Sequence, residues 1–277
     1  AFVIGAVAQL CSRAGLPHLL GFFVGGVAGV LFSYVVQAAL IFRRGPVQAG
    51  ASTINAQYNV AKADSLPVRL AAKQRRVMFA SFMRHFSPSP QDTVLDVGAT
   101  SDQSYEASNY LESWYPHKAQ VTACGIDDAS FLEQKYPGMR FVRVDGRSLP
   151  FPDAAFDWVH SSAVLEHVGS NAQQADFIRE LRRVARRGVF LTTPNRWFPV
   201  EFHSVLPLVH WLPMSWFRAI LRALGHAELA QEEHLNLLGS SEVRELCLRA
   251  DPASAPLIEM PRLWGWPSNI VCVMRRS

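Results

Sequence analysis

The chain has 277 residues, of which 49% are hydrophobic and 18% charged, and its formal net charge is +4 at neutral pH. This length allows one large domain or two small ones, and the mild charge gives no reason to expect a nucleic-acid partner. The spacing of His, Asp, Glu and Cys suggests no metal site. The cysteines form no CxxC pair and suit a reducing compartment: Cys11, Cys124, Cys247 and Cys272.

The N-terminal part differs in composition from the rest of the chain. The 24 residues from Leu19 to Phe42 carry no charge, and at about 1.5 Å of rise per residue they are long enough to cross a bilayer core of roughly 30 Å. A buried core helix or a signal-peptide core is the alternative. Core helices rarely run so far without a charge, and a signal peptide is followed by a small-residue cleavage site rather than by Arg43 and Arg44. We therefore expect a transmembrane helix.

A shorter apolar run, Ala1 to Cys11, precedes it. This run is about half the length of a span and the chain begins without methionine, so we expect a membrane hairpin over residues 1–44 whose first helix is truncated. Residues 45–63 have no sustained period and look like a linker. Residues 64–277 would form a second domain.

The distribution of charge predicts how the hairpin is oriented in the membrane, and the spacing of its glycines predicts a partner helix. Basic residues follow the long apolar run, which by the positive-inside rule places the C-terminal domain in the cytoplasm at the cell inner membrane. Three glycines recur at small-xxx-small spacing, which favours a helix-helix partner: Gly21, Gly25 and Gly29.

The second domain begins with a helix up to about Phe86, after which strands and helices alternate. The clearest helix is Ala172 to Ala185, and the basic run Arg179 to Arg187 fits its solvated face. This alternation predicts an α/β fold with a mostly parallel seven-stranded sheet and helices on both faces. We expect strands at Thr93–Val97, Gln120–Ile126, Arg140–Val144, Phe156–His160 and Gly188–Thr193, and a terminal antiparallel hairpin at Pro256–Met260 and Asn269–Met274.

In open parallel sheets, ligands bind beyond the carboxyl ends of the strands. The first strand ends in LDVGATSD, where a carboxylate and a glycine allow close approach to a ligand, and the second ends in GIDD, whose acidic residue can accept both hydroxyls of a ribose. The third ends in VDG, which can frame an adenine edge. The candidates are Asp96, Gly98, Thr100, Asp127, Asp128, Asp145, Gly146 and, after the fourth strand, Ser161.

Together these runs resemble the class I S-adenosylmethionine-dependent methyltransferases, especially the small-molecule, quinone-biosynthesis-like type. The runs VLDVGATS, GIDD, RVDGRSLPF and FDWVHSSAVLEHV are similar to that family's first four motifs, and the resemblance covers roughly Ala71 to Arg275. It implies a Rossmann-like domain with S-adenosylmethionine as cofactor. It also implies that Asp96 and Gly98 line the methionine end, Asp127 holds the ribose, Asp145 holds the adenine amine, and Ser161 lies at the edge of the transfer site.

One departure stands in the first loop. The family pattern E/DxGxGxG has three glycines, whereas here Thr100 and Asp102 replace the second and third. Either side chain would crowd the cofactor or re-route the loop, so a non-catalytic membrane scaffold or regulatory subunit with the same fold is the alternative function. The hydrophobic hairpin resembles the GtrA-like membrane family, which would favour a lipid-linked acceptor.

The segment after the fifth strand, Thr192 to His203 and on to Pro213, is the natural place for an acceptor because it is long, aromatic and polar at the functional edge. Glu201 and His203 alternate on an extended segment and are candidates for an acid/base pair; His203 bonded to a backbone carbonyl is the alternative. His160 competes for the same role, and His167 is expected to be structural.

The aromatic run Trp197 to Pro213 also fits contact with a membrane interface. The expected function is a membrane-tethered methyltransferase acting on a small-molecule or lipid-linked acceptor.

Overall fold

The structure is a computed structural model that describes residues 66–103, 106–204 and 206–276. The predicted membrane hairpin and linker, residues 1–63, lie outside the described residues. Among the helices that are described, none combines the length and the apolar character needed to cross a membrane.

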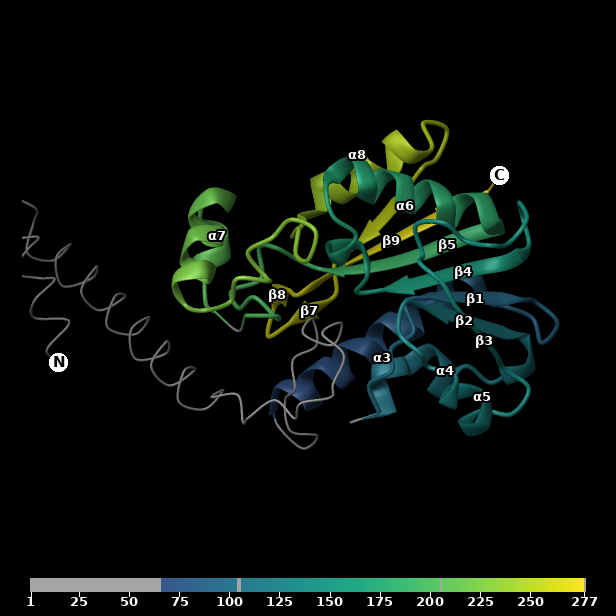
Figure 1. The fold of residues 1–277 in the computed structure, drawn as a ribbon. Coiled ribbons are helices and arrows are strands. Elements are labelled where there is room, and N and C mark those ends of the chain that lie inside the picture. The colour runs from purple at the N-terminus through teal and green to yellow at the C-terminus, as the bar shows by residue number, and fades with distance from the viewer. Residues whose placement is uncertain (1–65, 104–105, 205, 277) are drawn as a thin grey trace, which may run out of the picture.

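A seven-stranded sheet forms the centre of the domain, in the order β3-β2-β1-β4-β5-β9-β6 (Figure 1). The first five strands are parallel, and β9 runs antiparallel to both β5 and β6. This confirms the predicted sheet and its antiparallel terminal strand. The strands are β1 (Val94–Val97), β2 (Val121–Gly125), β3 (Arg140–Arg143), β4 (Phe156–Ser162), β5 (Ala185–Pro194), β6 (Leu257–Glu259) and β9 (Asn269–Arg275).

Helices cover both faces of the sheet (Figure 1). One face carries α3 (Leu66–Phe86), α4 (Tyr110–Trp114) and α5 (Phe131–Lys135), and the other carries α6 (Asn171–Val184) and α8 (Ser240–Ala250). A separate apolar cluster forms around α7 (Met214–Ala223), which the sequence did not predict. Four 3₁₀ turns complete the described elements: η2 (Glu106–Asn109), η3 (Lys118–Gln120), η4 (Leu165–His167) and η5 (Val209–Trp211).

Helix α6 illustrates how the sequence directs packing. Ser170 caps its first turn and Gln173 completes a capping box, so the helix begins where its free amide groups find acceptors. Phe177, Ile178 and Leu181 recur on one face and are fully buried against the sheet. The prediction of a solvated basic face was wrong at Arg182, which is buried and pairs with Asp251 at 2.7 Å, because α8 covers that side.

The chain between β6 and β9 is more elaborate than the single turn expected from sequence. It forms a small antiparallel hairpin of β7 (Arg262–Leu263) and β8 (Trp266–Pro267), which turns through Trp264 and Gly265, both with positive φ. Trp264 at this turn is 76% exposed. The hairpin therefore presents an aromatic side chain to solvent beside the carboxyl end of β5.

Candidate active site

The first loop leaves β1 through a glycine that no other residue can replace without strain. Gly98 has a φ of +116°, and an added Cβ would lie 2.1 Å from Cγ2 of Val164. Its amide donates to the carbonyl of Cys124 at 2.8 Å, which ties the loop to β2. The backbone therefore stays close to the edge of the sheet where a ligand would approach.

The two positions that lack glycine are held by hydrogen bonds. The Thr100 amide donates to Oδ1 of Asn109, and Nδ2 of Asn109 donates back to the Thr100 carbonyl, both at 2.9 Å. The Asp102 amide donates to Oγ1 of Thr100, and Ser108 donates to the Asp102 carboxylate. The loop is thus fixed to η2 rather than left to the conformational freedom of glycine.

The acidic residues after β2 have different environments. Asp127 is 6% exposed, and its Oδ2 atom is buried with no hydrogen-bond partner. Burial raises the pKa of this carboxyl despite the charge of Arg143. Asp128 is exposed and accepts the amide of Ser130 at 3.0 Å, so one of its oxygens holds the local turn.

The two candidate residues after β3 also differ from each other: Asp145 makes polar contacts, and Gly146 allows close packing. Asp145 accepts hydrogen bonds from Arg147, which lower the pKa of its carboxyl. At Gly146 an added Cβ would lie 2.7 Å from Val97 and 2.9 Å from Phe177. Its small size lets α6 pack closely against the sheet.

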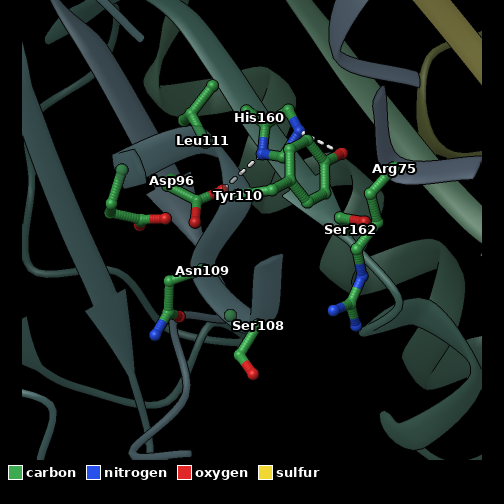
Figure 2. A pocket seen from close by; sticks show the side chains of 10 residues that line it. Arg75, Asp96, Ser108, Asn109, Tyr110, Leu111, His160 and Ser162 are labelled. Atoms are coloured by element: carbon green, nitrogen blue, oxygen red, sulfur yellow. Dashed lines mark hydrogen bonds and ion pairs between the residues drawn. The ribbon is translucent and has the colours of Figure 1, made fainter. Parts of the chain in front are cut away.

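Asp96 and His160 meet because β1 and β4 pair in a register that sets them side by side. Nδ1 of His160 interacts with the Asp96 carboxylate, and its Nε2 lies 2.8 Å from the hydroxyl of Tyr110 (Figure 2). His160 is 1% exposed and stacks on Phe190. Burial lowers the pKa of His160 to about 4 and raises that of Asp96 to about 6. Both ring nitrogens of the predicted base His160 are thus engaged by neighbouring side chains inside the fold.

A small cavity of about 30 Å³ opens beside this pair (Figure 2). Sequence reasoning found only three of its lining residues, because most of the others come from α3, η2 and α4, which carry no motif. The predicted Ser161 is buried and donates to the Val97 carbonyl, whereas its neighbour Ser162 lines the cavity. The lining residues are Arg75, Asp96, Gly98, Ser108, Asn109, Tyr110, Leu111, Glu112, His160 and Ser162.

On the acceptor side, Glu201 and His203 do form a pair, but in a turn rather than on an extended segment. Nδ1 and the amide of His203 lie 2.7 and 2.8 Å from Oε1 of Glu201, and the Ser204 amide donates to Oε2 at 2.5 Å. Against the effect of burial, the charge and hydrogen bonds of His203 lower the pKa of Glu201 to about 2. Burial opposes ionisation of His203 as well, yet Glu201 raises its pKa. The two side chains form a buried ion pair.

A second histidine lies against this pair. The rings of His167 and His203 are 4.7 Å apart and perpendicular, and Nδ1 of His167 donates to the His234 carbonyl at 2.6 Å. With Glu166 they bring three possible ligand atoms within 4.8 Å of one another. No spacing in the sequence indicated this cluster, because its residues come together only through the fold.

Comparison with known proteins agrees with this geometry. Residues 95–193 match the family described as Methyltransferase domain, a match that does not reach the predicted membrane hairpin. A probable S-adenosylmethionine-dependent methyltransferase of Mycobacterium tuberculosis is 35% identical over 81 residues, which make up 28% of this chain and 28% of that protein. The chain thus spans less than a third of the length of the curated relatives it matches.

Solved structures share the fold at low sequence identity. A putative sarcosine dimethylglycine methyltransferase from Galdieria sulphuraria superposes with a TM-score of 0.52 at 12% identity, over 76% of this chain and 88% of that one. Magnesium protoporphyrin IX methyltransferase from Synechocystis, solved with bound S-adenosylhomocysteine, gives 0.50 at 13% identity, over 89% and 94%. Residues 95–193 therefore match a methyltransferase domain, and the described residues share the Rossmann-like fold of these solved methyltransferases.

Proposed function

We propose that the chain transfers a methyl group from S-adenosylmethionine to a small-molecule or lipid-linked acceptor. The observation that carries the proposal is the buried, unpartnered Oδ2 atom of Asp127 at the end of β2. A buried carboxylate oxygen without a partner is costly. A ribose hydroxyl would donate a hydrogen bond to this Oδ2 atom and so remove the cost of burying it.

The surrounding residues fit the rest of the cofactor. Gly98 and Gly125 keep the first loop and β2 close together, since a Cβ on Gly125 would lie 2.2 Å from the Ala99 carbonyl. Asp145 at the end of β3 would accept the adenine amine. Asp96 and Arg75, which line the cavity with opposite charges, would face the amino and carboxylate groups of the methionine end.

The cofactor supplies an electrophilic methyl group on a sulfonium. What the chain contributes is position: the carboxylates at the ends of the strands hold the cofactor, and the post-β5 segment brings the acceptor in line. Within that segment, Glu201 holds His203 through one contact with its ring Nδ1 and one hydrogen bond from its backbone amide. The pair is therefore the candidate for contacting an acceptor hydroxyl or amine, and a base is needed only if the acceptor must lose a proton.

Tethering to the inner membrane, with this domain on the cytoplasmic side, is part of the proposal. It rests on the uncharged run Leu19–Phe42, with a helix partner through the glycines named above, and on exposed tryptophans near the post-β5 segment. These aromatic side chains favour an acceptor presented at a lipid interface, such as a polyprenyl-linked one. They are Trp197, Trp216, Trp264 and Trp266.

The test is transfer of label from methyl-tritiated S-adenosylmethionine by the full chain. A lipid extract and an aqueous small-molecule extract serve as separate acceptor pools, with Asp127→Ala as the control. Label in the lipid pool that depends on Asp127 supports the whole proposal, and label only in the aqueous pool removes its lipid part. Label in neither pool contradicts catalysis and favours the scaffold.

A further inference from the structure

Three side chains with metal-binding atoms converge beside the carboxyl ends of β4 and β5. Glu166 and His167 come from η4, and His203 comes from the segment after β5. The Glu166 side chain is fully buried; its Oε2 accepts the Thr193 hydroxyl at 2.8 Å, whereas its Oε1 has no partner. An unpartnered carboxylate oxygen at 0% exposure is costly unless a cation or donor occupies the space beside it.

In each of the two imidazoles, one ring nitrogen contacts a carbonyl or carboxylate oxygen and the other ring nitrogen is left free. The His234 carbonyl can only accept, so Nδ1 of His167 carries the proton and Nε2 keeps its lone pair. His203 places Nδ1 against the Glu201 carboxylate in the same way, which leaves its Nε2 unused. Metal-binding histidines are typically oriented by a carbonyl or carboxylate on the other nitrogen, and both kinds of support are present here.

We propose that Glu166, His167 and His203 bind one divalent first-row transition ion, such as Zn²⁺. Two imidazoles and one carboxylate form a ligand set of the catalytic zinc type, with a fourth position open to water or to an oxygen of the acceptor. Oε1 of Glu166 and Nε2 of His167 are 3.9 Å apart, so a small movement of either side chain would bring both within bonding distance of one ion. The side chains of both histidines are 13% exposed, which leaves a path for an ion to enter.

The ion would link two segments that no strand pairing joins directly. It would tie η4 to the turn that contains His203, and it would balance the buried charge of Glu166. The competing occupant is a proton, with His203 as a cation between Glu201 and Glu166. That arrangement needs no metal, and it is the alternative that the experiment must exclude.

The experiment uses the full chain, stripped with a chelator and titrated with Zn²⁺ or Co²⁺. We expect one equivalent of Zn²⁺ to bind, and bound Co²⁺ to give visible absorption bands of a four-coordinate site. Glu166→Gln and His203→Gln should abolish binding. Glu201→Gln, which removes only the support of His203, should weaken it by about 10 to 100-fold.

A matched control exists at the other end of the domain. His85 and Glu259 form a similar histidine–carboxylate contact of 2.8 Å but have no second imidazole in the cluster, so His85→Gln should bind Zn²⁺ as the unchanged chain does. Circular dichroism shows whether each variant folds. The absence of a Co²⁺ band in the folded, unchanged chain would overturn the proposal without recourse to any variant, and so would unaltered Zn²⁺ binding by folded Glu166→Gln.

Discussion

Gly98 combines two constraints that a side chain would violate. Its φ of +116° is strained for any L-residue, and the added Cβ would meet Val164 at 2.1 Å. We predict that Gly98→Ala lowers the free energy of unfolding by about 3 kcal/mol. Gly225, with a φ of +83° and nothing within 4 Å, is the matched control and should lose only about 1 kcal/mol. Urea unfolding of the two variants measures the difference, and equal losses would refute the steric argument.

Glu112 offers a test through pH. Its carboxyl is fully buried, and burial together with the nearby Asp96 raises its pKa well above the usual value of 4.5. A raised folded-state pKa means that the folded chain keeps a proton which the unfolded chain releases, so stability falls as pH rises above 4.5. Glu112→Gln, which is neutral at every pH, should therefore gain stability over the unchanged chain as pH goes from 5 to 8.

The control for that measurement is Glu245→Gln. Glu245 is exposed on α8 and pairs with Arg249, so its replacement should change the free energy of unfolding by less than about 1 kcal/mol. Its difference from the unchanged chain should also stay constant between pH 5 and 8. A Glu112→Gln difference that is equally flat would show that Glu112 ionises normally in the folded state.

For single residues, the sequence predicted which ones lie at the ends of strands, but not toward which side of the strand each side chain points. Asp127 follows its strand directly, and the structure leaves a buried oxygen of this residue without a partner. Ser161 and Ser162 differ by one residue, and a strand's period of two makes the choice between them depend on register. The contact between Asp96 and His160 depends in the same way on how β1 pairs with β4.

At the scale of elements, two substitutions in α6 compare the stability that comes from helix capping with the stability that comes from core packing. Ser170→Ala removes the N-cap and half of the capping box, which should cost about 1 kcal/mol. Leu181→Ala empties a fully buried position on the same helix and should cost about 2–5 kcal/mol. Thermal and urea unfolding of both variants test this ranking. A capping loss as large as the packing loss would mean that the helix start governs the domain's stability.

Elements with a clear period were predictable, and those without one were not. The inner strands of the sheet and α6 carry apolar runs or faces that match burial in the fold, whereas the edge strands β3 and β6 are only partly buried. Helix α7 was missed because it follows a proline- and aromatic-rich stretch that looks like a loop, and because its apolar face packs on a local cluster rather than on the sheet. The cluster of Glu166, His167 and His203 joins two such segments, so no spacing in the sequence predicts it.

For the whole molecule, the account depends on a bound cofactor at the carboxyl edge of β1, β2 and β3. The two aspartates after β2 allow a sharp comparison, because Asp127 is buried with a free oxygen and Asp128 is exposed and bonded to Ser130. They are adjacent in sequence and equal in charge. A difference between their variants therefore reports on position rather than on net charge.

The most direct measurement is isothermal titration of S-adenosylmethionine and S-adenosylhomocysteine into the full chain, Asp127→Asn and Asp128→Asn. The account predicts saturable binding of both ligands by the unchanged chain and by Asp128→Asn. It predicts a loss of at least about tenfold for Asp127→Asn, the scale of one charge-assisted hydrogen bond. No binding by the folded chain, or equal binding by the two variants, would contradict it.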